Sequence, residues 1–371
     1  MEIRVRREDL LRGLHLVQGV VERRSPQPIL AHVLIEPEDK GIAVSATDMD
    51  IGFRGHVDSI VTKPAPITAS ARKLYEIARE VGSDEVVVRS VADGWLEVLA
   101  GRSKFKVVSL DPGEFPELPL REPAPKGATI RVAAGTLREM IDRTIFSVST
   151  DETRYNLSGV FMEAADKGTL RMVATDGHRL ALIDRSVAGL KMPRGVIMPR
   201  KGLVELRKIL DDAEVADVGL VVGEREIRVE LEGVSFFMRL IEGEFPNYNQ
   251  VIPKESSKKA VVQRDDFLAA LRRTSLLANE RSHGVRVGIA PGKLTLAASN
   301  PDQGEASEDI EASYNGDAVQ VGFNSRYLLE VLNVHAQGDT VEIGLTDEVG
   351  PGVLKAAQDP DYTYVLMPMR L

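Results

Sequence analysis

The residues most able to do chemistry lie in one short run, Thr175-Asp176-Gly177-His178-Arg179. On a strand, Asp176 and His178 would point to the same face, where they could act as an acid–base pair or bind a metal. The same run could instead form a turn in which Thr175 and Asp176 bond to local backbone groups. An active site needs further partners, so the rest of the sequence decides between these alternatives.

The sequence offers few partners for such a site. Its other histidines, at positions 15, 32, 56, 283 and 335, stand alone, and no Gly-x-Ser-x-Gly, phosphate-loop, His-Glu-x-x-His or Gly-x-Gly-x-x-Gly motif occurs. The chain has 371 residues and no cysteine, which excludes disulfides, thiolate metal sites and cysteine nucleophiles. We therefore expect no catalytic residue, no metal site and no cofactor.

Part of the run recurs on either side of it, as Ala46-Thr47-Asp48 and Ala298-Ser299-Asn300. Met49 and Pro301 stand where the middle copy has Gly177, and neither outer copy offers a histidine. The Thr-Asp part therefore indicates a turn that every copy needs. The part from Gly177 to Leu180 is special to the middle copy.

The elements around these turns also repeat, each time as a short strand followed by an amphipathic helix. The predicted strands are Ile3 to Val5, Thr129 to Val132 and Ala260 to Val262. The helices carry at helical spacing Leu10, Leu14, Val17 and Val21 in the first copy (about residues 7–21), Leu137, Ile141, Ile145 and Val148 in the second, and Phe267, Leu271, Ser275 and Ala278 in the third.

Further matches follow in the same order. Tight turns are predicted at Asp39-Lys40-Gly41, Asp166-Lys167-Gly168 and Pro291-Gly292-Lys293, and second helices at Arg72 to Val81, Lys201 to Leu210 and Arg326 to Val334. An alternating strand covers 226–231, and Gly-Glu-Phe-Pro closes the first two copies at 113–116 and 243–246. Linkers fall at 123–127 and 254–259.

These matches predict three α+β repeats, at 1–122, 128–253 and 258–371, each with two helices and antiparallel strands. Unrelated α+β domains are the alternative. Like units joined end to end close into a ring or grow into a filament, so a ring is a natural hypothesis.

The net charge of −9 argues against a uniformly basic nucleic-acid binder. The predicted helices nevertheless carry an excess of basic residues, while the remainder of the chain is strongly acidic. Such helices could attract phosphates without reading sequence, or they could simply be solvated surfaces. The first residues lack the apolar run of a signal peptide and no segment matches a membrane span, so we expect a cytoplasmic protein.

The repeats, Ala-Thr-Asp-Gly-His-Arg-Leu at 174–180, Gly-Glu-Phe-Pro-Asn-Tyr at 243–248 and the C-terminal 364–371 together resemble the bacterial DNA sliding clamps, the beta subunits of DNA polymerase III. The resemblance covers the full length. It implies a clamp fold of three repeats per chain, a head-to-tail homodimer that forms a ring around duplex DNA, and a processivity function without catalysis. It also implies sequence-independent DNA binding, with the polymerase III alpha subunit, the clamp loader and other clamp-binding proteins as partners.

In that family, partners insert a short peptide into an apolar cleft between the second and third repeats. Carried over to matching positions, the cleft would comprise Leu157, Thr175, Gly177, His178, Arg179, Leu180, Pro246, Val251, Asn324, Tyr327, Val365, Leu366, Met367, Pro368, Met369, Arg370 and Leu371. Leu, Val, Met and Pro suit an adaptable pocket, and His178, Arg179, Asn324 and Arg370 could fix the peptide backbone. Gly350-Pro351-Gly352 and Gln250 depart from the family pattern at the rim.

Two further surfaces follow from the resemblance and the charges. The head-to-tail seam would involve Lys73, Arg102, Lys104, Phe105 and Val107 on one chain end, and Leu276, Leu277, Glu305, Glu308 and Asp309 on the other. The DNA-facing residues would be Arg24, Lys73, Arg200, Lys201 and Arg207. A monomeric peptide-binding scaffold without DNA remains the alternative if dimerisation fails.

Overall fold

The computed structural model describes residues 1–22, 26–121, 127–151, 153–212 and 216–371. Its contacts divide the chain into two compact units. Unit 1 comprises Met1–Arg138, Gly189–Pro193 and Lys201–Leu240, and unit 2 comprises Glu139–Ala188, Arg194–Arg200 and Ile241–Leu371. The middle predicted repeat contributes to both, so the compact units divide the chain differently from the repeats. The repeat boundaries stay a prediction.

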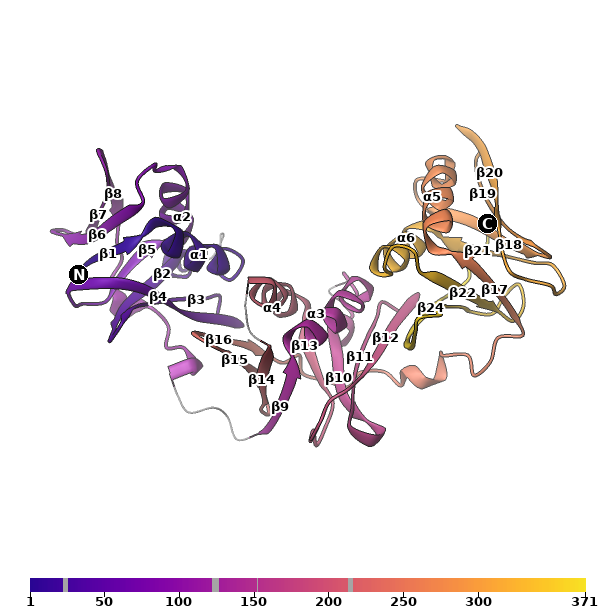
Figure 1. The fold of residues 1–371 in the computed structure, drawn as a ribbon, viewed down its shortest axis with the longest axis horizontal. Helices are drawn as coiled ribbons and strands as arrows, with labels where there is room; N and C mark the ends of the chain where they lie inside the picture. Colours follow the sequence, from indigo (N-terminus) through magenta and orange to yellow (C-terminus); the bar gives the residue numbers. More distant parts are fainter. Residues whose placement is uncertain (23–25, 122–126, 152, 213–215) are drawn as a thin grey trace. The chain divides into compact units, whose positions relative to one another are not determined.

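Unit 1 is built on a 12-stranded sheet whose main path runs β8-β7-β6-β1-β4-β16-β15-β14-β9, with β2, β3 and β5 joined to its side (Figure 1). Its strands are β1 (Glu2–Arg6), β2 (His32–Glu38), β3 (Gly41–Thr47), β4 (Ile51–Lys63), β5 (Ile67–Ser70), β6 (Glu85–Val91), β7 (Trp95–Ala100), β8 (Ser103–Val108), β9 (Ala128–Ala133), β14 (Asp217–Val222), β15 (Glu226–Leu231) and β16 (Val234–Arg239). The pairing of β4 with β16 joins the first repeat to part of the middle one.

Unit 2 contains an eight-stranded sheet, β13-β10-β11-β12-β24-β23-β22-β17, and a four-stranded sheet, β20-β19-β18-β21. Their strands are β10 (Gly159–Ala165), β11 (Thr169–Thr175), β12 (Arg179–Ser186), β13 (Val196–Pro199), β17 (Lys258–Gln263), β18 (Gly284–Ala290), β19 (Lys293–Asn300), β20 (Gly304–Glu311), β21 (Val319–Asn324), β22 (Thr340–Leu345), β23 (Gly352–Ala356) and β24 (Asp359–Leu366). The pairing of β12 with β24 joins the middle repeat to the third, as β4 and β16 do in unit 1.

The six predicted helices are present: α1 (Arg7–Val17), α2 (Ala71–Glu80), α3 (Ala134–Asp142), α4 (Arg200–Asp212), α5 (Arg264–Thr274) and α6 (Ser325–Val334). With the antiparallel sheets, they confirm the α+β class. The prediction was wrong about where the first helix of each repeat ends. Short 3₁₀ helices, η4 (Ile145–Ser147) and η8 (Ser275–Leu277), follow α3 and α5 where continuous helix was expected, and α1 ends before Val21.

A threonine gives the early endings of α3 and α5 a physical cause. Thr144 Oγ1 donates to the Met140 carbonyl at 2.7 Å, and Thr274 Oγ1 donates to the Ala270 carbonyl at 2.9 Å. Such bonds to the carbonyl four residues earlier compete with the helix ladder and bend or end it. The apolar spacing continues past the break, so a period count alone overruns the helix.

The predicted turns are confirmed at Gly41, Gly168 and Gly292, whose φ angles are 151°, 76° and 78°. The strand at 226–231 is confirmed as β15. The first linker falls mostly on residues outside the described ranges. The second is shorter than predicted, because β17 already begins at Lys258.

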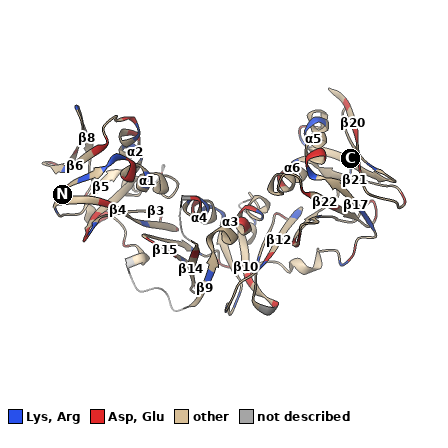
Figure 2. Ribbon diagram, viewed as in Figure 1, with Lys and Arg blue, Asp and Glu red and all other residues tan. Residues whose placement is uncertain are grey.

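Acidic residues accompany the basic ones on the helices, as Figure 2 shows for α2, α4 and α5. Arg72 and Lys73 on α2 pair with Glu76 at 2.6 and 2.9 Å, and on α4 Arg207 pairs with Asp211 at 3.1 Å. These exposed pairs contribute little to stability. They do lower the free positive charge that the helices can offer.

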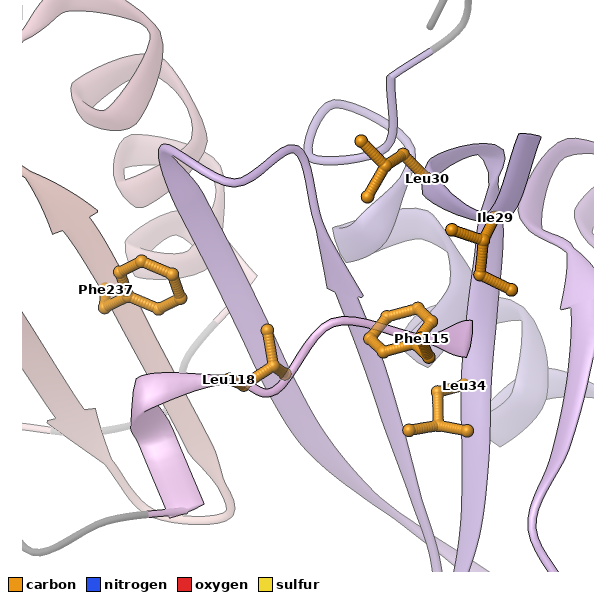
Figure 3. Packing of buried hydrophobic residues seen from close by; sticks show 6 residues of the cluster. All are labelled: Ile29, Leu30, Leu34, Phe115, Leu118 and Phe237. Atoms are coloured by element: carbon orange, nitrogen blue, oxygen red, sulfur yellow. The ribbon is translucent and has the colours of Figure 1, made fainter. Parts of the chain in front are cut away.

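One apolar cluster fixes the arrangement within unit 1 (Figure 3). Phe237 on β16 packs with Phe115 of the first Gly-Glu-Phe-Pro motif and with Leu118, which follows that motif. It also packs with Ile29, Leu30 and Leu34 of the first repeat. Phe115 retains 8% of its exposed surface and Phe237 retains 2%. The first repeat therefore shares a core with part of the middle one.

No helix within the described ranges is long and apolar enough to cross a membrane.

Candidate partner-binding cleft and chain-end surfaces

The Thr-Asp run forms a turn between β11 and β12. Thr175 Oγ1 donates to the Arg179 carbonyl at 2.6 Å and accepts from the Gly177 amide at 3.0 Å. Asp176 Oδ1 accepts from the amides of His178 and Arg179 at 2.9 and 3.1 Å. Gly177 has a φ of 87°, which glycine adopts without strain. The Thr175 hydroxyl and the Asp176 carboxylate are thus used by the local backbone.

The first copy forms the same turn between β3 and β4. Thr47 Oγ1 donates to the Ile51 carbonyl at 2.8 Å and accepts from the Met49 amide at 2.9 Å, and Asp48 Oδ1 accepts from the Asp50 and Ile51 amides. Met49 has a φ of 83°, close to that of Gly177. The prediction that the Thr-Asp element is a repeated turn is confirmed. In the described part of the chain, no cluster of three or more His, Asp or Glu could hold a metal.

Next to the middle turn lies an apolar cavity of about 300 Å³. It is lined by Leu157, Thr175, Gly177, Arg179, Leu180, Pro246, Asn247, Tyr248, Val251, Val365 and Met367. The pairing of β12 with β24 places Leu180 opposite Val365. Nine of these residues are among those that the resemblance placed in the cleft. Val251 and Met367 are 46% and 41% exposed, which leaves apolar surface at the rim.

Two lining residues, Asn247 and Tyr248, were missed from the sequence. Tyr248 is buried, and its hydroxyl donates to Glu163 and accepts from Arg171 at 3.2 Å. Arg171 is itself held by Asp184 at 2.6 Å. Burial, partly offset by Arg171, raises the pKa of Tyr248. An aromatic directly after Gly-Glu-Phe-Pro-Asn was the signal that could have identified this wall.

Arg179 supports the wall from inside the chain. It is 7% exposed, and its donors go to Asp176 at 3.0 Å, to the Phe146 carbonyl at 2.5 Å and to Glu330 on α6. Its guanidinium also stacks on the Tyr327 ring, 4.2 Å from the centroid. Burial lowers the pKa of Arg179, but Tyr364 and Glu330 more than offset this, so the net shift is upward. Each nitrogen of the Arg179 guanidinium therefore already has a partner within the chain, and its role in fixing a peptide backbone stays a prediction.

Other predicted cleft residues are held by the chain as well. Asn324 Oδ1 caps α6 by accepting from the Arg326 amide at 2.9 Å, and the His178 carbonyl accepts from the Met367 amide at 2.9 Å. The residues that the cavity lining omits are His178, Asn324, Tyr327, Leu366, Pro368, Met369, Arg370 and Leu371. Gln250 is exposed beside Val251.

The segment Gly350-Pro351-Gly352, which departs from the family pattern, forms a compact turn. The Gly350 amide donates to Asp347 Oδ1 at 2.6 Å, and Gly352 opens β23 opposite Leu366. β23 therefore starts directly after this turn and pairs with β24, the strand that leads into the tail.

The predicted DNA-facing residues lie mostly on helices. Lys73 pairs with Glu76 at 2.9 Å, and the two cations next to Glu76, Lys73 first and Arg72 second, lower its pKa to about 2. Lys201 pairs with Asp48, and Arg200 is exposed. Arg207 pairs with Asp211 as described above. Arg24 lies outside the described residues.

Apart from Lys73 on α2, the predicted seam residues lie on or beside two strands that each end a sheet. On β8, Lys104 pairs with Glu97 at 2.6 Å, Phe105 and Val107 are half-buried, and Lys106 lies over the Trp95 ring at 4.8 Å from its centroid. Arg102 and Glu305 are exposed at the starts of β8 and β20. Beside β20, Leu276 is 77% exposed and Leu277 is half-buried. On β20 itself, Glu308 accepts a hydrogen bond from Arg273 at 2.9 Å, and Asp309 forms an ion pair with Lys293 at 2.6 Å.

Comparison with known proteins gives a consistent result. Family models for the N-terminal, central and C-terminal domains of the DNA polymerase III beta subunit match residues 1–119, 131–247 and 249–370. The beta sliding clamp of Pseudomonas putida is 38% identical, and that of Caulobacter vibrioides is 37% identical, each over 100% of both chains.

Solved structures agree with the family models. The DNA polymerase III beta subunit of Pseudomonas aeruginosa has a TM-score of 0.92 at 37% identity, over 100% of both chains. A Bartonella birtlesii sliding clamp bound to griselimycin has a TM-score of 0.93 at 36% identity, also over 100% of both. The chain has the three-domain clamp fold and belongs to the bacterial DNA polymerase III beta-subunit family, so it is a DNA sliding clamp, a non-catalytic processivity factor of the replicative polymerase.

Proposed function

We propose that the cavity beside the middle turn is the docking site for partner peptides, including one from the polymerase III alpha subunit. The observation that carries this is an open, mainly apolar cavity with exposed Met367 and Val251 at its rim. A volume of about 300 Å³ suits one or two large apolar side chains. Methionine adapts to differently shaped ligands, which suits a site that serves several partners.

The related structures are in keeping with a ligand site on this fold. Clamps of Pseudomonas aeruginosa and Bartonella birtlesii are described as bound to griselimycin. A Caulobacter crescentus clamp, with a TM-score of 0.93 at 36% identity over 100% of this chain and 99% of that one, is described with PEG bound to a putative beta-motif tethering region.

Two chains then close head to tail, with β8 of one chain against β20 of the other. Each strand ends its sheet, so its outer backbone groups are available for pairing. Lys104 and Lys106 on β8 are basic, whereas β20 carries the acidic residues Glu305, Glu308, Asp309 and Glu311. Opposite charges favour the head-to-tail pair and disfavour β8 on β8 or β20 on β20. The apolar contacts come from Phe105 and Val107 against Leu276 and Leu277.

The ring encircles duplex DNA, and Lys73, Arg200, Lys201 and Arg207 give it a weak, sequence-independent attraction to phosphates. Because three of these cations already have acidic neighbours, we expect low affinity for free DNA and a marked salt dependence. Weak contacts leave the ring free to slide. The protein acts in the cytoplasm, where a clamp loader opens the ring and places it on DNA.

Retention on DNA tests the whole proposal. The clamp, loaded by its clamp loader, is expected to stay on nicked circular DNA through gel filtration and to be lost when that circle is linearised, since only a topological link depends on closure. The doubly substituted Leu276→Ala, Leu277→Ala chain should be a folded monomer that is not retained. Equal retention on linear DNA, or an unchanged dimer in that variant, would refute the ring or the seam.

A further inference from the structure

The last residues of the chain connect the two sheets of unit 2. The Met367 amide donates to the His178 carbonyl at 2.9 Å, which extends the pairing of β12 and β24 by one residue. Two residues later, the Met369 amide donates to the Gly322 carbonyl at 2.8 Å, on β21 at the edge of the four-stranded sheet. Pro368, between them, has no amide hydrogen to donate. The tail is therefore fixed at two points, one on each sheet.

Because two glycines have no side chain, there is room beside them for the last residue of the tail. A Cβ at Gly284 on β18 would overlap the Leu371 side chain. A Cβ at Gly322 would lie 2.5 Å from the Met369 carbonyl oxygen and 2.9 Å from Leu371. Neither glycine has a positive φ, so the requirement for glycine here comes from this close approach and not from backbone conformation. A side chain at position 322 would push the tail backbone away, and one at position 284 would displace the Leu371 side chain from its place.

We propose that Gly284 and Gly322 form an anchor for Leu371, and that this anchor holds Met367 at the cavity rim in the position that receives a partner peptide. The inference rests on the proposed docking function of the cavity. Gly284 and Gly322 are positioning residues, because they act through the tail and line no part of the cavity. A tail that is already ordered lowers the entropy lost when a peptide binds.

The test compares two glycine substitutions in the same strand. In Gly284→Ala the new methyl group overlaps Leu371, whereas in Gly288→Ala the nearest heavy atom is at 3.7 Å, an ordinary contact. Amide exchange of the C-terminal peptide, measured by mass spectrometry on the full-length ligand-free clamp, should be at least about fivefold faster in Gly284→Ala, as expected for losing one hydrogen bond. It should be unchanged in Gly288→Ala.

Binding of the purified alpha subunit supplies the second measurement. Gly284→Ala should weaken it about fivefold, with no change in dimer mass or melting temperature. In a Leu371→Ala background the obstacle to the methyl group is gone, so adding Gly284→Ala should weaken binding no further.

The outcomes separate the two proposals. Equal tail exchange in Gly284→Ala and Gly288→Ala would overturn the anchor. Faster exchange with unchanged alpha-subunit affinity would overturn its link to docking. Failure of the unmodified clamp to bind the alpha subunit would overturn the docking function itself, while the exchange data would still report on the anchor.

Discussion

The two strand junctions of this chain follow one plan but differ in what fills them. In unit 1, after the Thr47-Asp48 turn, Ile51 pairs with Met238 and the Arg239 amide donates to the Asp50 carbonyl at 2.8 Å. In unit 2, after the Thr175-Asp176 turn, Arg179 pairs with Leu366, and the Met367 amide donates to the His178 carbonyl at 2.9 Å. Residue for residue, the backbones of the two junctions match.

One pair of positions makes the difference. At the first junction Gly52 lies opposite Phe237, and a Cβ on Gly52 would overlap the Phe237 ring. The ring packs into the cluster with Phe115 and Leu118 that Figure 3 shows. At the second junction the same positions hold Leu180 and Val365, and a cavity of about 300 Å³ remains. A glycine–phenylalanine pair thus closes one junction, and a leucine–valine pair leaves the other open.

The largest expected effect on stability comes from removing the phenylalanine ring that fills the junction of unit 1. Phe237→Ala removes a side chain that is 2% exposed, so the free energy of unfolding should fall by about 3–5 kcal/mol. Urea unfolding followed by circular dichroism measures the loss. Phe245→Ala is the control. The half-buried Phe245 ring stacks on Phe161 with the ring centroids 5.0 Å apart, and its removal should lower the free energy of unfolding by less. An equal cost at both positions would contradict the comparison.

Lowering the pH should destabilise unit 2 more than unit 1. His335 in unit 2 is 3% exposed, and neither of its ring nitrogens has a hydrogen-bond partner in the described structure. Burial, with Arg143 nearby, lowers the pKa of His335 from 6.5 to about 4. The unfolded chain therefore takes up this proton first, and unit 2 should lose up to about 3 kcal/mol as the pH falls from about 6.5 towards 4.

His56 in unit 1 behaves in the opposite way. The hydrogen bond with Glu38 at 2.8 Å raises the pKa of His56, so its contribution is complete at acid pH and is lost only as the pH rises through the folded-state pKa. Amide-exchange free energies near neutral pH and at about pH 5 should show unit 2 weakening relative to unit 1. His335→Phe should remove that difference, and its persistence in this variant would rule out His335 as the cause.

Plugging the open junction is the converse change. Val365→Phe places a ring at the position equivalent to Phe237 of unit 1. The alpha subunit should therefore bind at least about 30-fold more weakly, while the melting temperature stays unchanged. Isothermal titration measures the affinity. Val349→Phe, at a position 80% exposed on the turn before β23, is the matched control and should bind as the unmodified clamp does. Full affinity in Val365→Phe would show that ligands bind elsewhere.

The smallest effect concerns the turns themselves. Met49 holds a φ of 83° at the position where the second turn has Gly177. Met49→Gly relieves about 1–2 kcal/mol of strain and adds about 0.5–1 kcal/mol of backbone entropy cost, so stability should rise by up to about 1.5 kcal/mol. Thermal unfolding of the variant checks this. A loss of stability would mean that the Met49 side chain, which is 42% exposed, makes packing contacts worth more than the strain.

Much of this architecture could be predicted from the sequence, because turns and amphipathic helices are local features. A Thr-Asp pair, or Ser299-Asn300 in the third copy, stands where each copy needs a turn. The apolar spacing of Leu10 and Leu14 suffices to identify a helix. The resemblance supplied the cleft residues that line the cavity. The ends of α3 and α5 were missed, because a threonine bond to the previous turn leaves no trace in the apolar period.

The side chains that fill the first junction, or leave a cavity at the second, could not be predicted either. They depend on which side chain on β16 or β24 lies opposite Gly52 or Leu180, and that register is set by long-range pairing. The role of Arg179 was hidden for the same reason, since Glu330 is 151 residues away in the sequence. Local patterns identify the elements, but the spaces between them depend on pairs that are distant in sequence.

The contact between Lys106 and Trp95 has a practical consequence. Trp95 is the single tryptophan of the chain, it pairs with Val108 of β8, and β8 is the strand proposed to meet the partner chain. Intrinsic fluorescence of this clamp is therefore a one-site signal located one strand from the seam. Opening of the ring by the loader could be timed in stopped flow on the unlabelled protein, and the absence of cysteine leaves every position free for a second, engineered dye.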